Sequence, residues 1–514
     1  MEKCRIFAPQ NVAVRPHLFY ILTYMALLSV SIESISQTLS SWIWSPALVA
    51  LCLFSALYFS IRTRFVQVRR FGAMARLLFS TDKEQKTGIS SFQAFAMALS
   101  GRVGTGNIVG VATAIGYGGP GAIVWMWIIA FLGAGSAFVE ATLAQIYKEH
   151  HNGQYRGGPS YYIEKGLRCK WLAVVFAVCS LLACGLLLPQ VQCNGIAIAV
   201  ANTIHIPPVY VGLGVAFVLG LVIIGGVTRI ANVAQIVAPF MAILYIILAI
   251  VVLICNASAI PSVFADMFKG AFGMHELFGG IIGSTIAWGV KRGIYSNEAG
   301  QGTGPIVAAA AKVSHPVKQG LVQAFSVYVD TLLVCSATAV MIMAVKTYNV
   351  MDASTGEVLF RSAYNLGAPD VSYTSTAIGT LLGTTPGNVV VAVALAFFAF
   401  TTIMAYYYYA ETSIVYLFGK GRKEQVAIRV LRVCILIAVV FGSMKEARTA
   451  WNAGDIGVGA MAWINIIVIL LLSPKAIRAL KDYEKQEKEG KDPVFDPQKM
   501  NIENSDFWNN PTKD

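Results

Sequence analysis

The chain has few charged residues. Of its 514 residues 13% are Asp, Glu, Lys or Arg and 56% are hydrophobic, whereas soluble domains are about a quarter charged. The 39 basic residues outnumber the 27 acidic ones, but they stand in short loops between apolar runs. This distribution is typical of a multi-pass membrane protein and argues against a nucleic-acid partner.

The sequence also lacks the patterns of a metal centre or a disulfide framework. It has six histidines and no His-Glu-x-x-His pair, and its nine cysteines show no C-x-x-C spacing. Most of these cysteines lie inside apolar runs, as small buried residues do. No cofactor is therefore expected. The nucleophile–base pair that an intramembrane enzyme would need is also not found, which leaves that class a remote alternative.

What the chain has in abundance is apolar runs close to the 20 or so residues that cross a bilayer as a helix. Eleven spans are predicted, at residues 46–61, 91–117, 120–147, 171–202, 207–226, 231–255, 277–300, 319–345, 386–416, 430–444 and 451–473. The fold class is thus all-α and integral to the membrane.

The loops predict the orientation. Seven basic residues between Arg62 and Lys86 place that loop in the cytoplasm. Alternation from there puts the basic loop 148–170 inside and the loops 256–276 and 346–385, which have no basic excess, outside.

Three parts of the chain are predicted on this basis. Residues 1–40 are either a cleaved signal peptide or an extra helix, and the sequence leaves both open. Residues 41–474 form the transmembrane domain, and 475–514 form a charged cytoplasmic tail.

One stretch at membrane depth is rich in glycine and polar residues: Ser100-Gly101-Arg102-Val103-Gly104-Thr105-Gly106-Asn107. Irregular backbone is tolerated in a membrane where it is buried in protein or lines a cavity. Its free N–H groups can hold a carboxylate and its free C=O groups a cation. The alternative is close helix packing, because Gly106 and Gly110 form a G-x-x-x-G pair. A dinucleotide loop is excluded, since no strand precedes the glycines.

A second interrupted segment lies five spans later. Gly279 to Thr285 begins the seventh span, and Ser296-Asn297-Glu298-Ala299-Gly300-Gln301-Gly302 ends it. Two glycine-broken helices at corresponding positions predict an inverted-repeat transporter with a site at the midplane. The repeats would be residues 91–255 and 277–473, five helices each, with 46–61 as an accessory helix.

Several of these motifs resemble one family, the alanine/glycine–cation symporters. They are Ala98 to Asn107, Gly118-Gly119-Pro120-Gly121-Ala122 with Trp125-Met126-Trp127, Gly153 to Pro159, Ser296 to Gly300 and Pro493-Val494-Phe495-Asp496-Pro497. The resemblance covers roughly residues 46–498. It implies the leucine-transporter fold, coupling to sodium, and alanine or glycine as typical substrates.

The resemblance also implies a site. The substrate would lie at the break of the first repeat helix, at Gly104, Thr105, Gly106 and Asn107. Sodium would lie between the carbonyl groups of Ser100 and Val103 and the hydroxyl groups of Thr401 and Thr402. The pocket walls would be Gln192, Asn194, Ser284, Thr285, Thr402, Ile403 and Tyr406. Many relatives carry tryptophan at the position of Tyr406 and glutamine at that of Ser284, which leaves the substrate open.

Some of these residues have other interpretations. Threonines in a membrane often bond to their own helix backbone, which would explain Thr401 and Thr402 without an ion. Arg102 beside the break is expected to pair with Glu140 or Asp330, or else to face a wet vestibule.

Taken together, these patterns predict a symporter of the inner membrane. It would import a small neutral amino acid (alanine, glycine or serine) with sodium by alternating access. Proton coupling through Glu140 or Asp330 is the alternative.

Overall fold

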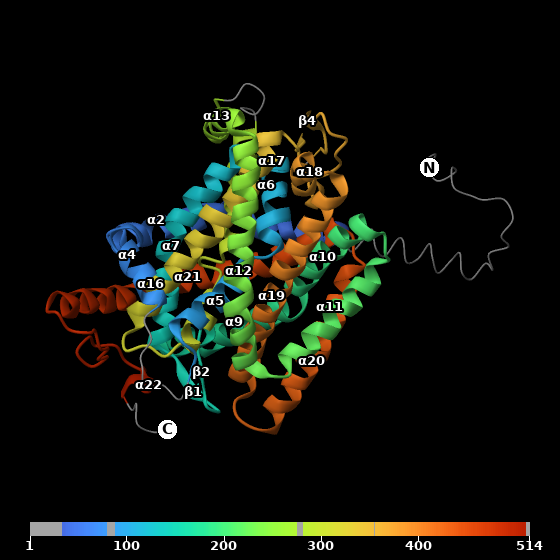
Figure 1. Ribbon diagram of the computed structural model, residues 1–514. Coiled ribbons are helices and arrows are strands. Elements are labelled where there is room, and N and C mark those ends of the chain that lie inside the picture. The colour runs from blue at the N-terminus through green and yellow to red at the C-terminus, as the bar shows by residue number, and fades with distance from the viewer. Residues whose placement is uncertain (1–32, 80–87, 275–280, 354, 510–514) are drawn as a thin grey trace.

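The computed structural model describes residues 33–79, 88–274, 281–353 and 355–509 (Figure 1). Most of the predicted N-terminal signal peptide or extra helix, and the glycines 279–280, lie outside these ranges. The first described helix, Glu33–Ile43, meets the next at an angle of 41°.

The described chain is almost entirely helical. The helices up to the middle of the chain are α2 (Pro46–Arg62), α3 (Val66–Arg69), α4 (Phe71–Leu78), α5 (Ser91–Arg102), η2 (Gly106–Gly110), α6 (Val111–Gly118), α7 (Ala122–Ile146), α8 (Pro159–Leu167), α9 (Lys170–Leu182), η3 (Ala183–Leu187), α10 (Leu188–Ile204), α11 (Pro208–Ile223), α12 (Gly226–Cys255), η4 (Ala257–Ala259) and α13 (Ile260–Ala271). The later helices are α14 (Ile282–Asn297), α15 (Gly304–Ala310), α16 (Pro316–Val327), η6 (Tyr328–Cys335), α17 (Ser336–Val345), α18 (Val371–Leu382), α19 (Thr384–Phe418), α20 (Arg422–Ser443), α21 (Ala447–Lys488) and α22 (Asp506–Asn509).

Two short antiparallel hairpins complete the described fold. Strand β1 (Glu149–His151) pairs with β2 (Gln154–Arg156), and β3 (Val350–Met351) pairs with β4 (Val358–Phe360).

Seven described helices are long and apolar enough to cross a membrane, and an eighth is added if the bent pair Glu33–Ile43 and α2 counts as one span. The chain is therefore an all-helical integral membrane protein. Each of the eleven predicted ranges contains helix within its described residues. Four of the predicted ranges lack a long continuous helix. Range 46–61 belongs to the bent pair, and 207–226 falls on the short helix α11. Ranges 91–117 and 277–300 are interrupted.

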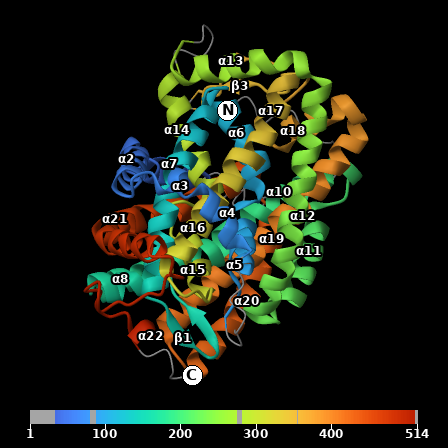
Figure 2. The same ribbon diagram turned by 60° about the vertical axis from the view of Figure 1, so that its left-hand side comes forward.

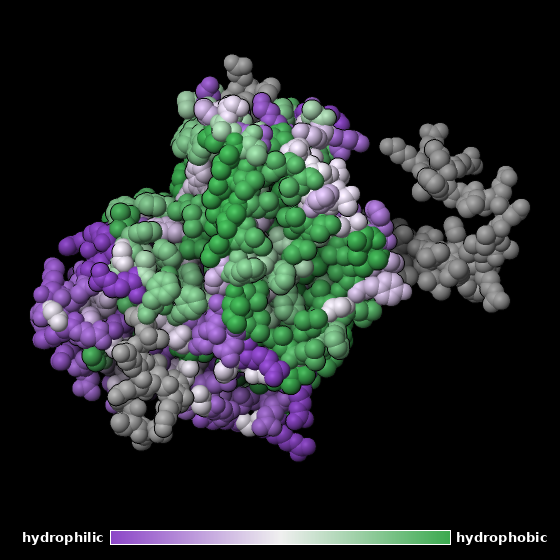
Figure 3. Space-filling view, in the orientation of Figure 1, coloured by the Kyte–Doolittle hydropathy of each residue, from purple (hydrophilic) through white to green (hydrophobic). Residues whose placement is uncertain are grey.

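Helix α12 shows how the outside of the bundle is built. Ile236, Phe240 and Ile243 are each at least 60% exposed and follow one another along one face, whereas Ala234 and Ala238 on the opposite face are buried. A soluble protein would not expose such a stripe. Figure 3 shows the hydrophobic surface of α12 and its neighbours between hydrophilic patches above and below, as expected for a bilayer-facing band.

The inner part of the bundle is organised around α7, which packs against α2, α14 and α16. Small residues allow this approach: a Cβ on Gly135 would lie 3.2 Å from the backbone N of Ser60 in α2. Helices α14 and α15 pack against α7, and α5 and α6 pack against α15 and α14. Figure 2 shows α6 and α14 close to α7. The residues of both breaks are buried.

The predicted cytoplasmic tail is folded against the predicted cytoplasmic loops. Helix α21 continues through residue 474 without a boundary. Beyond it, the Phe495 N–H donates to Ser314 O at 3.0 Å and the Trp508 indole donates to Gln145 O at 2.9 Å. His315 is enclosed there, and burial lowers its pKa to about 3.

Candidate functional site

The first break begins where α5 ends. A capping box starts this helix, with the Gln93 N–H donating to Ser90 Oγ at 3.1 Å. The helix stops at Arg102 because Val103 takes an extended conformation, with φ −77° and ψ 95°. Regular hydrogen bonding resumes as the π-turn η2 at Gly106. The predicted interruption is therefore present at the predicted residues.

Two side-chain amides close the break. The Gly104 N–H donates to Asn107 Oδ1 at 2.8 Å, and the Thr105 N–H donates to Gln192 Oε1 at 2.9 Å. Asn107 in turn donates from Nδ2 to Asp330 Oδ1 at 2.7 Å. The backbone N–H groups expected to face a substrate carboxylate are thus bonded to oxygen atoms of the protein.

The carbonyl oxygens of the same break meet α19. Thr402 Oγ1 lies 2.8 Å from Ser100 O and 3.1 Å from Val103 O, and also 2.9 Å from Phe398 O of its own helix. A hydroxyl has one proton and can satisfy only one of these three acceptors. A hard cation bound by carbonyl and hydroxyl oxygens would compensate the surplus of lone pairs, so the donor set fits sodium.

The neighbouring Thr401 is placed differently. Its Oγ1 donates to Phe398 O at 2.9 Å, within its own helix, and contacts neither Ser100 nor Val103 in the described hydrogen-bond network. The structure brings one of the two predicted threonines to the break.

The second break lies between α14 and α15. Its backbone turns through left-handed conformations at Glu298 (φ 56°), Gly300 (φ 84°) and Gly302 (φ 94°). Within the described ranges, both carboxylate oxygens of Glu298, both polar side-chain atoms of Gln301 and Thr303 Oγ1 are buried without a hydrogen-bond partner. Each such group costs about 1–3 kcal/mol unless water or a ligand satisfies it. The second break is therefore suited to a polar occupant.

Arg102 connects the two breaks. Its Nε donates to Asn297 O at 2.6 Å, and its Nη1 donates to Gln323 Oε1 at 3.1 Å and to Ser326 Oγ. The described residues include no carboxylate within ion-pair distance of it. The predicted pair with Glu140 or Asp330 is replaced by bonds to neutral groups.

The buried carboxylates differ in how well they are satisfied. Glu140 accepts from the Gly300 N–H at 3.2 Å and from Asn465 Nδ2 at 2.9 Å. Asp330 accepts from Asn107, from Ser296 Oγ at 2.9 Å and from Thr331 Oγ1 at 2.7 Å. Both carboxylates thus accept hydrogen bonds from the surrounding residues, whereas no hydrogen bond to either oxygen of Glu298 is formed within the described chain.

The residues of α14 nearest the first break are Tyr295 and Ser296. A Cβ on Gly106 would lie 3.4 Å from both the Tyr295 ring and the Ser296 Cα. The predicted wall residues Ser284 and Thr285 lie about 18 Å earlier along this helix. They donate to the carbonyls of Tyr117 and Gly118 at the end of α6, at 2.9 and 2.7 Å.

From the sequence, Tyr295 has no predicted role and Ser296 stands only in a motif. Ser296 begins the polar run Ser296 to Gly302 at the end of a predicted helix, and this run could have indicated that Ser296 lies at a site. For Tyr295, no local signal distinguishes it from a packed core residue.

The two residues of α10 predicted as pocket walls, Gln192 and Asn194, bond to different parts of the protein. Gln192 reaches the break, whereas Asn194 donates from Nδ2 to the carbonyls of Gly442 and Lys445, at 3.1 and 2.7 Å, and so ties α10 to the end of α20.

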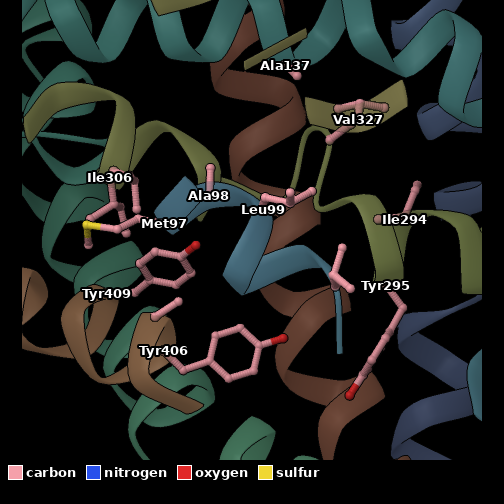
Figure 4. Packing of buried hydrophobic residues seen from close by; sticks show 14 of the residues in the cluster. Met97, Ala98, Leu99, Ala137, Ile294, Tyr295, Ile306, Val327, Tyr406 and Tyr409 are labelled. Atoms are coloured by element: carbon pink, nitrogen blue, oxygen red, sulfur yellow. The ribbon is translucent and has the colours of Figure 1, made fainter. Parts of the chain in front are cut away.

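The aromatic wall comes from α19 and α14. In Figure 4, Tyr406 and Tyr409 extend from α19 toward the interrupted helix α5, and Tyr295 extends from the other side. Tyr406 is 2% exposed and lies 5.9 Å from the Tyr409 ring, and the adjacent Ile403 is buried. A Cβ on Gly101 would overlap the Tyr409 hydroxyl, so glycine is required where this wall meets α5.

Comparison with known proteins identifies the kind of transporter. A sequence model of the sodium:alanine symporter family matches residues 29–497. The chain belongs to this family. A member of the sodium:alanine symporter family is a transporter and not an enzyme, so the predicted class, a multi-pass membrane symporter, is confirmed.

Three relatives cover nearly the whole chain. YrbD of Bacillus subtilis, whose name describes a sodium/proton-dependent alanine carrier, is 54% identical over 92% of this chain and 96% of its own length. The sodium/proton-dependent alanine carrier protein of Bacillus sp. PS3 is 47% identical over 84% of this chain and 96% of that protein. GlnT of Bacillus subtilis, named as a sodium/glutamine symporter, is 41% identical over 90% of this chain and 93% of its length.

Proposed function

We propose that this protein imports alanine, or a neutral amino acid of similar size, together with sodium by alternating access. The observation that carries the proposal is the position of Thr402 Oγ1 between the carbonyl oxygens of Ser100 and Val103. One sodium ion moving down 100 mV supplies about 2.3 kcal/mol for uptake.

The proposed architecture is the leucine-transporter fold with five-plus-five inverted repeats. Each interrupted helix, α5–α6 and α14–α15, would open one repeat, within residues 91–255 and 277–473, and α2 would be the accessory helix. The support is that both interruptions are buried and are linked through Arg102, which donates to Asn297 O. A site between two broken helices can be exposed to either side by moving one repeat against the other.

The proposed substrate site is the first break with its aromatic wall. Gln192 Oε1 and Asn107 Oδ1 occupy the positions on the Thr105 and Gly104 N–H groups that a substrate carboxylate would take. Binding would exchange these amide oxygens for the carboxylate. Tyr295 and Tyr406 are both buried, and walls of two large aromatic side chains favour a small substrate such as alanine. The relative named for glutamine is the reason to test larger amides as well.

A proton is the second candidate for the coupling ion. Two relatives are named as sodium/proton-dependent carriers. Of the three buried carboxylates near the breaks, Glu298 is the one with both oxygens unpaired within the described chain. Glu298, and not Glu140 or Asp330, is therefore our candidate for a proton carrier.

The adjacent threonines test sodium coupling. Thr402→Ala removes the hydroxyl oxygen from the proposed ion site and should raise the sodium concentration for half-maximal alanine uptake about tenfold or more in proteoliposomes. Thr401→Ala is the matched control, because among the described residues the Thr401 hydroxyl bonds to Phe398 O alone, and the sodium dependence of this variant should stay unchanged. Equal behaviour of the two variants, or uptake driven by a pH gradient with no response to sodium, would contradict the proposal.

A further inference from the structure

A groove opens on the membrane-facing surface, and none of the residues that line it belongs to the two breaks. It has a volume of about 860 Å³ and lies between α9 with η3, the C-terminal part of α19 and the first half of α20. Its lining is Leu181, Leu182, Leu186, Ile414, Phe418, Arg422, Lys423, Val426, Ala427, Val430, Leu431 and Cys434. Ten of these twelve residues are apolar.

The groove is held open by local backbone features. The π-turn η3 interrupts the helix from α9 to α10 on one side. On the floor, Gly185 lets Leu431 approach, since a Cβ there would lie 3.1 Å from Leu431 Cδ1. At the end of α19, Gly419 (φ 63°) and Gly421 (φ 138°) reverse the chain so that α20 starts at Arg422, at the mouth of the groove.

The two charged lining residues stand together at that mouth. Arg422 and Lys423 are exposed. Neither of them forms an ion pair with a described residue. The nearby acid, Glu424, is buried and bonded to His151 Nε2 at 2.7 Å. The mouth is therefore positive. It lies at the end of the protein that holds the hairpin β1–β2, which the loop charges predict to be cytoplasmic (Figure 1).

A long apolar groove with a basic pair at its cytoplasmic end has the chemistry of a phospholipid site. We propose that it binds one anionic glycerophospholipid, with an acyl chain along Leu182, Val426 and Val430 and the headgroup phosphate between Arg422 and Lys423. Basic residues at this depth attract anionic headgroups, and two of them should favour a lipid of net negative charge over a zwitterionic one about tenfold.

Native mass spectrometry of the purified full-length protein tests the proposal. The probes are phosphatidylglycerol and phosphatidylcholine with identical acyl chains. The wild type should retain one phosphatidylglycerol with about tenfold preference. The double variant Arg422→Gln, Lys423→Gln should bind both lipids equally. Arg429→Gln is the matched control, because Arg429 is exposed on the same helix but does not line the groove.

A second variant tests the groove itself. Ala427→Phe should fill it and reduce retention of both lipids without changing the charge. Loss of the preference in Arg429→Gln to the same extent as in the double variant would show attraction to overall surface charge and overturn the proposal. The proposal would also be overturned if Ala427→Phe and the double variant both retained the lipids as the wild type does. Formation of a dimer in place of the lipid-bound monomer would overturn it as well. Because these residues lie outside the ion and substrate site, failure here leaves the proposed symport unaffected.

Discussion

The first break is filled by the protein's own side chains, and the second is not. At Gly104 and Thr105 the free N–H groups bond to Asn107 and Gln192. At the second break the polar side-chain atoms of Glu298, Gln301 and Thr303 lack hydrogen-bond partners among the described residues. On the proposed function, a ligand would replace fixed amide oxygens at the first break, whereas water or an ion would satisfy the open polar atoms of the second.

The largest expected effect comes from filling the first break. A Cβ on Gly104 would lie 2.6 Å from Thr402 Oγ1 and 2.7 Å from Gln192 Oε1, so Gly104→Ala should displace both groups. We expect alanine uptake in proteoliposomes to fall more than about 100-fold, since misplaced site groups cost rate steeply.

Gly110→Ala is the control for this change. Its Cβ would have its nearest neighbour at 3.7 Å, an ordinary contact, so uptake should stay within about twofold of the wild type. If Gly104→Ala transported as well as Gly110→Ala, the first break would not be the site.

The next effect distinguishes the two kinds of buried carboxylate. Glu298→Gln removes a carboxylate that forms no ion pair among the described residues. If Glu298 carries the proton, uptake by the variant should no longer depend on pH, and its rate should be about tenfold lower than that of the wild type. The melting temperature should not change.

Glu140→Gln should behave in the opposite way. Replacing an oxygen of Glu140 by an NH₂ group places it against the Gly300 N–H or Asn465 Nδ2, which should cost about 1–3 kcal/mol of stability. Thermal unfolding and uptake at several pH values measure both variants. An unchanged pH profile in Glu298→Gln would remove the proton role.

The smallest effect concerns the two amides of α10. Gln192→Ala frees the Thr105 N–H and should change the KM for alanine severalfold. Asn194→Ala removes the side-chain donor to Lys445 O and leaves Gly442 O with backbone donors alone, so the melting temperature should fall while KM stays constant. Should both variants change only stability, the first break would be a structural joint and not a substrate site.

Much of the fold and part of the site were predictable. The two interruptions were predicted from glycine positions. The position of Thr402 beside Ser100 and Val103, and the contact of Gln192 with the break, agree with what the family resemblance implied. Ser284 and Thr285 were predicted as pocket walls, but the residues of α14 that the structure places against Gly106 are Tyr295 and Ser296. The pairing of Arg102 with an acid was also expected, whereas the structure supplies Asn297 O and two neutral side chains.

The sequence by itself determined the class of protein, the positions of the helices and the two breaks. Apolar length and glycine content act locally, so they can be read without knowing what lies opposite. Only the tertiary structure decided which polar residues meet. Thr401 and Thr402, or Gln192 and Asn194, differ by one or two positions, and each position turns a side chain by about 100° around the helix. Which of them faces the break depends on how α10 and α19 are rotated against α5, and that rotation is set by the packing of the whole bundle.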